Sequence, residues 1–531
     1  MSDSISLHVS AQTCKTELKA VWETNRRFGG FFRGRHRVNA AAVSVLLVFA
    51  SLLLGQDDLV RKSQAAKQAM AEGRFPQAVQ LYSELVHALP DNPGMLLNLG
   101  LALHSAGRYR EALLQFAAAL KLEPGLTTAR FLTGMSHLKL GETAAAIPHL
   151  REAVQAEPAN PLFRLELADS LLSTGHFRES ATHFRKLAEL IPRDPKAWHG
   201  LGLSYLGLSR EAFAALQKRE PDSKYILLIL ANSRFKEQQY RSAFSLYRRA
   251  LDRDSGLRGV HAALAAVYRA TGHANWAAVE DRSEHDLGSP NCSKAPAECA
   301  FQATRYDQVI AMPDSPETLY WKNRSYGELA IAALGELMRL PASPQIHELM
   351  AEALDLEGDH QQAAGELREA LQLASGDRRL EELLAKMLWR SREFDQAKPL
   401  LEKLVQTDPA SAELNFEFGD VLLQEEQAEN AIPWLEKAVK AEPQSLSAHA
   451  SLARAYARAG RAADAIPHFK AALAVDDDGS LHFQLAKAYQ ATGHANLAEA
   501  ALRQFEEIRS KTEAKNRLEQ DREITAPPGV R

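Results

Sequence analysis

Two of the three cysteines, Cys292 and Cys299, stand in or just after a charged segment at 284–296 that is rich in serine and proline. A disulfide between them is expected if this part of the chain is exported, because oxidising compartments favour disulfides. In a reducing compartment the same residues would be two free thiols. A zinc site would need four ligands, and only His285 lies nearby, so we expect no zinc there.

No sequence motif for catalysis is found. The chain lacks a phosphate-binding P-loop, a dinucleotide-binding Gly-x-Gly-x-x-Gly, a Gly-x-Ser-x-Gly elbow and a His-Glu-x-x-His zinc motif. Its 18 histidines are scattered, and several directly follow a glycine at an expected turn, as at His176, His273 and His494. Asp476–Gly479 resembles half of a calcium loop but lacks the spaced ligands and the distal glutamate. We therefore expect no enzyme, and no catalytic, cofactor-binding or metal-binding residue.

Composition describes a folded chain rather than a disordered one. Of the 531 residues, 46% are hydrophobic and 24% are charged, and aromatic residues make up 7%. The formal net charge is only −4, which gives no reason to expect nucleic acid as a partner.

The only long apolar run is Val38–Leu54, which carries no charge. It would span about 26 Å as a helix, which is short but sufficient to cross a bilayer. The segment 1–37 is basic, and Asp57 and Asp58 follow the run. The positive-inside rule then places 1–37 in the cytoplasm and the bulk of the chain outside. We expect 38–55 to be a single-pass anchor in an inner membrane. A cleaved signal peptide, which would give a secreted protein, and a buried soluble helix are the alternatives.

A period of 34 residues runs through most of the remaining chain. Small residues recur at Gly100, Gly134, Ala168 and Gly202, and again at Ala351, Ala385, Gly419 and Ala453; prolines recur at Pro90, Pro124, Pro158 and Pro192. A small residue lets two helices approach closely, Gly107 can end a helix with positive φ, and Pro124 stops the next helix. Each period is therefore a helical hairpin that must stack on its neighbours to bury its apolar face.

The pattern resembles the tetratricopeptide repeat family. The resemblance rests on Asn98–Leu103, Gly107–Ala112, Phe116, Ala119 and Pro124, and it recurs around Gly419 and Ala453. It implies an all-α, right-handed superhelical solenoid preceded by one transmembrane helix. The expected parts are a first array at 56–283, an irregular insert at 284–343, a second array at 344–510, and a capping helix end with a disordered tail at 511–531.

Two places depart from the period. The unit that begins at Pro195 has room for only a short second helix, expected around 210–218. In the insert, Ser315 or Asp314 is expected to cap a helix that runs to Leu340 and carries Tyr320 and Trp321. These aromatic residues either fill a junction between the arrays or form a specific docking surface.

In solenoids of this family the first helix of each hairpin lines the concave face, so the resemblance implies a set of candidate binding residues. In the first array they are Leu97, Leu101, Phe131, Met135, Leu165, Asp169, His199 and Leu203. In the second they are Glu348, Glu352, Asp355, Glu382, Trp389, Phe416 and Asp420. The first set would form an apolar groove that suits a helix or an extended peptide, and the second an acidic groove with two aromatic residues. Packing between repeats is the alternative role for each residue.

Chaperone-binding members of the family hold a partner's terminal carboxylates with lysine and asparagine side chains. Ser63, Lys67, Asn98, Thr128 and Leu132 occupy the corresponding places here. This set does not match, so a co-chaperone role is disfavoured.

The expected function is a non-enzymatic scaffold for protein–protein interaction, anchored in the membrane with its repeats on the extracytoplasmic side, where it assembles or tethers an envelope complex. Its partners would be proteins or peptides in the concave groove. The alternatives are a module of an export or secretion apparatus that binds polysaccharide or peptidoglycan, and an accessory subunit of a separately encoded enzyme.

Overall fold

The computed structural model describes residues 58–518 and 523–528. The predicted basic segment 1–37 and the predicted anchor 38–55 lie outside these residues. The described part of the chain consists of helices and connections and has no β-strand. Within it, no helix is both long and apolar enough to cross a membrane. The chain divides into two compact units, Met1–Pro124 and Gly125–Arg531.

The N-terminal unit is built from helical hairpins. Its helices span 58–71, α3 (Phe75–Ala88), α4 (Pro93–Ser105) and α5 (Tyr109–Leu122). Asn92 caps α4 by accepting a hydrogen bond from Met95 N at 3.0 Å. Gly107 turns the chain toward α5 with a φ of 76°, a conformation that glycine adopts without steric cost. A Cβ added to Gly100 would lie 2.4 Å from the ring of Phe116, so α4 and α5 approach closely where the period predicts it.

The second unit begins with two hairpins of the same kind. They are α6 (Thr127–Lys139) with α7 (Thr143–Ala156), and α8 (Pro161–Ser173) with α9 (Phe177–Leu190). Gly134 on α6 receives the side chain of Leu150 on α7, as Gly100 receives Phe116. Gly141 and Gly175 make the turns inside the two hairpins with φ of 75° and 78°.

The expected hairpin at Pro195 does not form, so the prediction of a short second helix at 210–218 is wrong. The residues instead form one continuous helix, α10 (Pro195–Arg219). Its partner is α17 (Pro316–Met338), which packs along it. Ser209 Oγ donates to Asn323 O at 3.0 Å, and Asn323 Nδ2 donates back to Ser209 O at 2.9 Å. Ser315, one of the two predicted caps, caps α17 in a reciprocal capping box with Thr318. The helix ends at Met338, two residues before the predicted Leu340.

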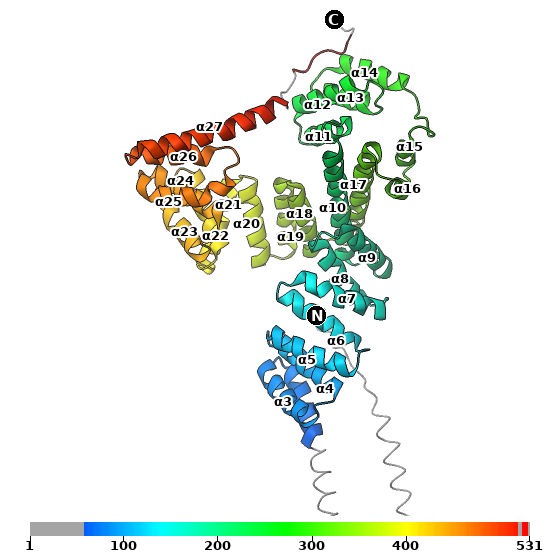
Figure 1. Cartoon of the computed structure of the whole chain (residues 1–531), viewed down its shortest axis with the longest axis vertical. Helices are drawn as coiled ribbons and strands as arrows, with labels where there is room; N and C mark the ends of the chain where they lie inside the picture. The colour runs from blue at the N-terminus through cyan, green and yellow to red at the C-terminus, as the bar shows by residue number, and fades with distance from the viewer. Residues whose placement is uncertain (1–57, 519–522, 529–531) are drawn as a thin grey trace, which may run out of the picture. The chain divides into compact units, whose positions relative to one another are not determined.

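The helices between α10 and α17 form a side branch, residues 220–315, here called the branch. They are α11 (Lys224–Lys236), α12 (Tyr240–Arg253), α13 (Val260–Ala270), α14 (Ala274–Asp286), α15 (Pro296–Gln302) and α16 (Tyr306–Ala311). In Figure 1, α11–α14 lie beyond the end of α10, and α15 and α16 lie beside α17.

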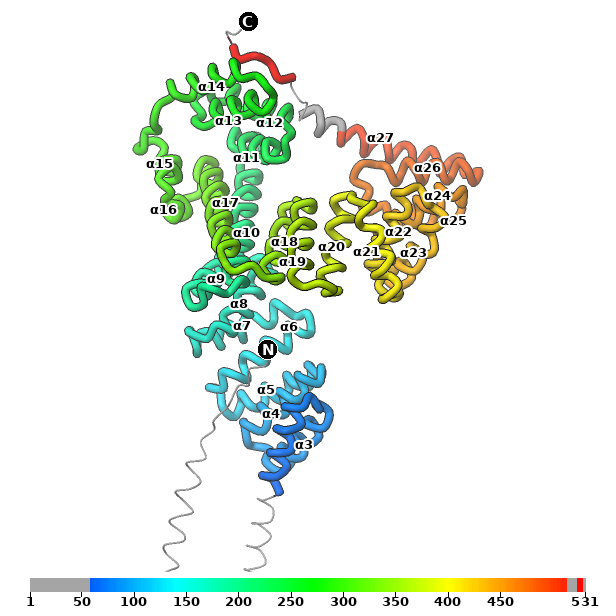
Figure 2. Tube along the Cα trace, turned by 180° about the vertical axis from the view of Figure 1, so that it is seen from behind, coloured from blue at the N-terminus to red at the C-terminus, as the bar shows by residue number. Residues whose placement is uncertain are grey.

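The chain after α17 forms the second array, seen from yellow-green to red in Figures 1 and 2. Its helices are α18 (Pro344–Glu357), α19 (His360–Leu373), α20 (Arg378–Arg390), α21 (Phe394–Thr407), α22 (Ala412–Gln424), α23 (Ala428–Ala441), α24 (Leu446–Arg458), α25 (Ala462–Ala472), α26 (Ser480–Ala491) and α27 (Ala495–Leu518). Helix α18 packs on α10, where Arg210 Nη2 donates to Leu356 O at 2.8 Å. The stack of hairpins therefore passes from α10 and α17 directly to α18.

Residues 523–528 follow as extended chain beside α13 (Figure 2). The hydroxyl of Tyr268 on α13 donates a hydrogen bond to Thr525 O at 2.7 Å. The prediction of a disordered tail therefore does not hold for these residues.

Candidate functional site

The apolar residues predicted to line the first groove are partly used for packing. Leu97 and Leu101 are half-buried on α4 of the N-terminal unit. In the second unit, Phe131 is buried and stacks on Phe163 with ring centroids 4.4 Å apart. Met135 and Leu165 are half-buried, whereas Leu203 is buried. Of this predicted set, four side chains, Leu97, Leu101, Met135 and Leu165, keep partial access to solvent.

The predicted residues His199 and Glu352 come close where α10 packs on α18, and Asp169 lies on α8, which also packs on α10. Asp169 and Glu352 are exposed. His199 is buried, and its Nε2 lies 3.8 Å from Glu352 Oε2 without a hydrogen-bond partner among the described residues. Burial lowers the pKa of His199 to about 4, so the ring is neutral at pH 7. Desolvation by the surrounding helices, followed by repulsion from Glu166, raises the pKa of Asp169 to about 6. Desolvation also raises the pKa of Glu352.

Three acidic residues predicted for the second groove are paired with arginines. Both carboxylate oxygens of Glu348 bind Arg379, and Asp355 binds Arg390. Glu382 accepts a hydrogen bond from Arg378 Nε at 2.8 Å. The acidic character expected of this groove is therefore largely neutralised by arginines of the same or the following hairpins.

Trp389 and Phe416 form the aromatic part of the predicted second groove, on α20 and α22. Both side chains are half-buried, and their rings meet edge to face at 5.4 Å. Trp389 Nε1 donates to Asp420 Oδ2 at 2.9 Å, and Ser451 Oγ donates to Asp420 Oδ1 at 2.7 Å. Asp420 is buried, so it accepts both bonds away from solvent and fixes the indole ring. We call Trp389, Phe416 and Asp420 the aromatic patch.

A hollow lies beside each ring of the aromatic patch. One, of about 290 Å³, is lined by Trp389, Asp420, Arg390 and Phe394. The other, of about 280 Å³, is lined by Phe416, Glu413 and Glu442. Half-exposed aromatic rings beside small hollows are the kind of surface that anchors a protein partner's side chains.

Glu417 was missed by the sequence reasoning. It is only 2% exposed on α22. Burial, with repulsion from Glu413 and Glu382 against attraction by Lys386, raises its pKa to about 8. The 34-residue period could have indicated its burial. It places Glu417 at the same repeat position as Leu383 and Ser451, which lie on the first helices of the neighbouring hairpins.

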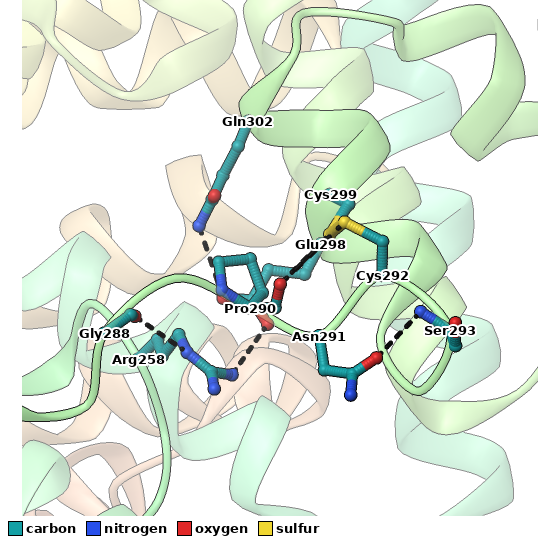
Figure 3. The surroundings of a disulfide bond; sticks show 9 residues. All are labelled: Arg258, Gly288, Pro290, Asn291, Cys292, Ser293, Glu298, Cys299 and Gln302. Atoms are coloured by element: carbon teal, nitrogen blue, oxygen red, sulfur yellow. Dashed lines mark hydrogen bonds and ion pairs between the residues drawn. A yellow bond between two sulfur atoms is a disulfide. The ribbon is translucent and has the colours of Figure 1, made fainter.

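The insert contains the expected cysteine pair. Cys292 and Cys299 form a disulfide, with Cα atoms 5.6 Å apart, between the loop after α14 and α15 (Figure 3). Arg258, just before α13, contacts both partners of this link. Its side chain donates to Gly288 O in the loop at 3.3 Å and to Glu298 Oε2 on α15 at 3.4 Å. A hollow of about 380 Å³ lies between these residues and α17.

The aromatic residues of the insert are buried rather than displayed. Tyr320 and Trp321 are 5% and 9% exposed. The guanidinium of Arg324 lies 4.6 Å from the centroid of Phe301 and 5.5 Å from that of Trp321. This arrangement favours the junction-filling role for these residues. Among the described residues, no group of three or more His, Cys, Asp or Glu side chains is placed to hold a metal ion.

Two family models, both described as tetratricopeptide repeat, match the chain. One matches residues 64–127, 105–161 and 206–257, and the other matches residues 137–202, 388–455 and 422–480. The matches thus fall in the N-terminal unit, in the hairpins α6–α9, in the later part of α10 with the start of the branch, and in the second array.

Relatives share short stretches of the chain. TPR repeat-containing protein MJ1428 of Methanocaldococcus jannaschii is 29% identical over 121 residues, 23% of this chain and 21% of that protein. The Hsp70-Hsp90 organizing protein of Triticum aestivum is 30% identical over 114 residues, 22% of this chain and 19% of that protein. The chain therefore spans about a fifth of the length of these curated relatives.

Among solved structures, MamA of Desulfovibrio magneticus is 19% identical, with a TM-score of 0.29, over 32% of this chain and 96% of that one. The family models cover hairpins whose turns, close helix contacts and stacking the structure shows directly. The chain belongs to the tetratricopeptide repeat family.

Proposed function

We propose that this chain is a scaffold that binds another protein through the aromatic patch of the second array. The observation that carries the proposal is the half-exposed pair of rings, Trp389 and Phe416, between two hollows. The bond from Trp389 to Asp420 holds one ring in place before a partner arrives. A rigid aromatic anchor loses little conformational freedom on binding, which makes it an effective contact point.

The paired charges around the patch favour specificity over general attraction of basic proteins. Glu348, Asp355 and Glu382 are each bound to an arginine. A basic partner would have to compete with these arginines, whereas an apolar side chain could enter the hollows without breaking them. The partner surface is therefore expected to present apolar or aromatic side chains.

We further propose that residues 38–55 anchor the chain in a membrane, with the repeats on the extracytoplasmic side, where it assembles or tethers an envelope complex. The apolar run and the basic residues before it support this topology. The disulfide in the insert agrees with it, because exported proteins keep disulfides and cytosolic proteins seldom do.

A similarity to a protein named for organising Hsp70 and Hsp90 supports the scaffold role in general. The residues at the carboxylate-binding places, among them Ser63 and Leu132, do not support chaperone tails as the partner. We therefore expect a partner other than a chaperone tail.

Co-purification after crosslinking in intact cells tests the proposal. We expect the chain in the membrane fraction, together with a stoichiometric protein partner that is lost in Trp389→Ala and in Phe416→Ala. Trp434→Ala is the matched control, since Trp434 is a half-buried tryptophan of the same array that packs on Phe418 from α23. Recovery of the chain alone, or of carbohydrate with it, would contradict protein binding and favour a polymer-binding role.

A further inference from the structure

The chain's own C-terminal segment lies on the branch. After α27 ends at Leu518, residues 523–528 run as extended chain beside α12–α14, as both views show (Figures 1 and 2). Three contacts hold the segment. Tyr268 Oη donates to Thr525 O at 2.7 Å, Ile524 packs against the apolar core of the branch, and Pro527 is buried.

The tyrosine ring that receives the segment is closely packed by neighbouring rings. The ring of Tyr268 is fully buried and lies between Phe244, at 5.8 Å, and Trp276, at 5.6 Å. Trp276 in turn stacks on His273 at 4.1 Å. Packing on both sides fixes the ring, so the hydroxyl group is held ready to donate to a main-chain carbonyl.

The bound segment is chemically distinct from the chain before it. Residues 511–523 are dominated by charged side chains, whereas Ile524, Thr525, Ala526, Pro527 and Pro528 carry no charge. Proline keeps the backbone extended before binding, so less conformational entropy is lost when the segment docks. One main-chain acceptor and two apolar side chains separated by two residues would define what this surface recognises.

We propose that the surface of α12–α14 around Tyr268 is a docking site for an extended, uncharged segment with the pattern Ile-x-x-Pro, and that residues 524–527 of this chain occupy it in cis. The site is separate from the aromatic patch, so it does not depend on the scaffold partner. The docked segment ties the end of the second array to the branch. It also keeps the site closed to any other segment of the same chemistry.

A labelled synthetic peptide of residues 522–531 tests the proposal on the detergent-solubilised full chain. The double variant Ile524→Glu/Pro527→Glu of the full chain should release its own tail from the site, and the peptide should then bind saturably. The wild-type chain should bind the peptide at least ten-fold more weakly, because its own tail occupies the site. A peptide that carries the same two substitutions should not bind.

Tyr268→Phe, added to the double variant with the released tail, removes only the hydroxyl donor. It should weaken the binding of the peptide by about three- to ten-fold, as expected for one hydrogen bond. Its melting temperature should stay close to that of the released chain, since the ring remains. If the released chain does not bind the peptide, or if wild type binds it equally well, the docking site is refuted. Light scattering should show the same monomeric mass for the wild-type chain and for the variant with the released tail. A wild-type dimer that the tail substitutions dissociate would show exchange between copies and overturn docking in cis.

Discussion

Gly202 on α10 receives the side chain of Leu334 on α17, although more than a hundred residues separate them in the sequence. A Cβ added to Gly202 would lie 2.9 Å from Leu334 Cγ, much as one added to Gly134 would lie 2.8 Å from Leu150. In the regular hairpin, Gly134 and Leu150 belong to the same repeat. The second half of α17 therefore serves as the second helix of the repeat that α10 begins, and the branch is an insertion within that repeat.

Adding one methyl group at each of two glycines tests this packing. Gly202→Ala should lower the free energy of unfolding by about 1–3 kcal/mol, because Leu334 must shift. Gly335→Ala, on the facing helix, meets nothing within 4 Å and should be neutral or stabilise by up to about 1 kcal/mol. Denaturant melts of both variants measure the difference. Equal effects of the two substitutions would argue against the close approach of α10 and α17.

Removing the branch tests the insertion directly. Residues 208–326 would be replaced by a three-residue turn, Leu-Gly-Glu, copied from the turn at 140–142 between α6 and α7. Gly207 then precedes this turn and Gly327 follows it, so Gly202 and Leu334 fall within one repeat of ordinary length. We expect a helical chain that unfolds cooperatively, as circular dichroism would record. An aggregated or partly unfolded product would mean that the branch is needed to fold the array.

Glu417 predicts a stability that depends on pH. Its folded pKa of about 8 exceeds its ordinary value of 4.5, so the folded state binds a proton that the unfolded state releases between these values. The contribution of this protonation to the free energy of unfolding is fully present below pH 4.5 and is lost as the pH rises through 8. Glu417→Gln removes this titration. It should stabilise the chain by roughly 2–4 kcal/mol above pH 8.5 and by little at pH 4.5.

The matched control for Glu417 is Glu402→Gln, an exposed residue of α21. Melting temperatures of the three proteins between pH 4.5 and 9 provide the measurement. A Glu417→Gln effect that does not grow with pH would show that the carboxyl group is ionised without penalty.

The cysteines predict a thiol count. The full chain contains three cysteines, and alkylation before reduction should label one, Cys14. Alkylation after reduction should label all three. Replacing Cys292 and Cys299 by serine should cost about 2–3 kcal/mol for the insert, as expected for a short closed loop. Labelling of three thiols in the unreduced chain, isolated under conditions that block exchange, would rule out the bond in the cell.

The hairpins could be predicted from the sequence because their determinants are local and periodic. Gly107, Gly141 and Gly175 each take a positive φ of 75–78° at the turn. The next position in this series is Ser209, which has no such freedom, and the helix continues through it as α10. Serine adopts a positive φ less readily than glycine, which favours the continuous helix. The turns at Gln238, Arg392 and Glu426 nevertheless form with positive φ and without glycine, so a missing glycine alone could not have predicted the loss of this hairpin.

Features that join distant residues could not be predicted. The residues around Gly202 do not indicate that Leu334 packs on it. The arginines that neutralise Glu348 and Asp355 likewise come from the following hairpin. The aromatic pair of Trp389 and Phe416 was predicted on one face, but its fixation by Asp420 and Ser451 depends on three stacked helices. The docked tail was signalled only by the change from charged to uncharged residues at Ile524.

Site-specific photocrosslinking in cells tests the scaffold function most directly. A benzoylphenylalanine would replace Trp389 or Phe416, and for comparison Trp434 or Glu402, one at a time. We predict an adduct with the same single protein from positions 389 and 416, and none from 434 or 402. No protein adduct at 389 and 416, or equal adducts at all four positions, would contradict the aromatic patch as the binding surface.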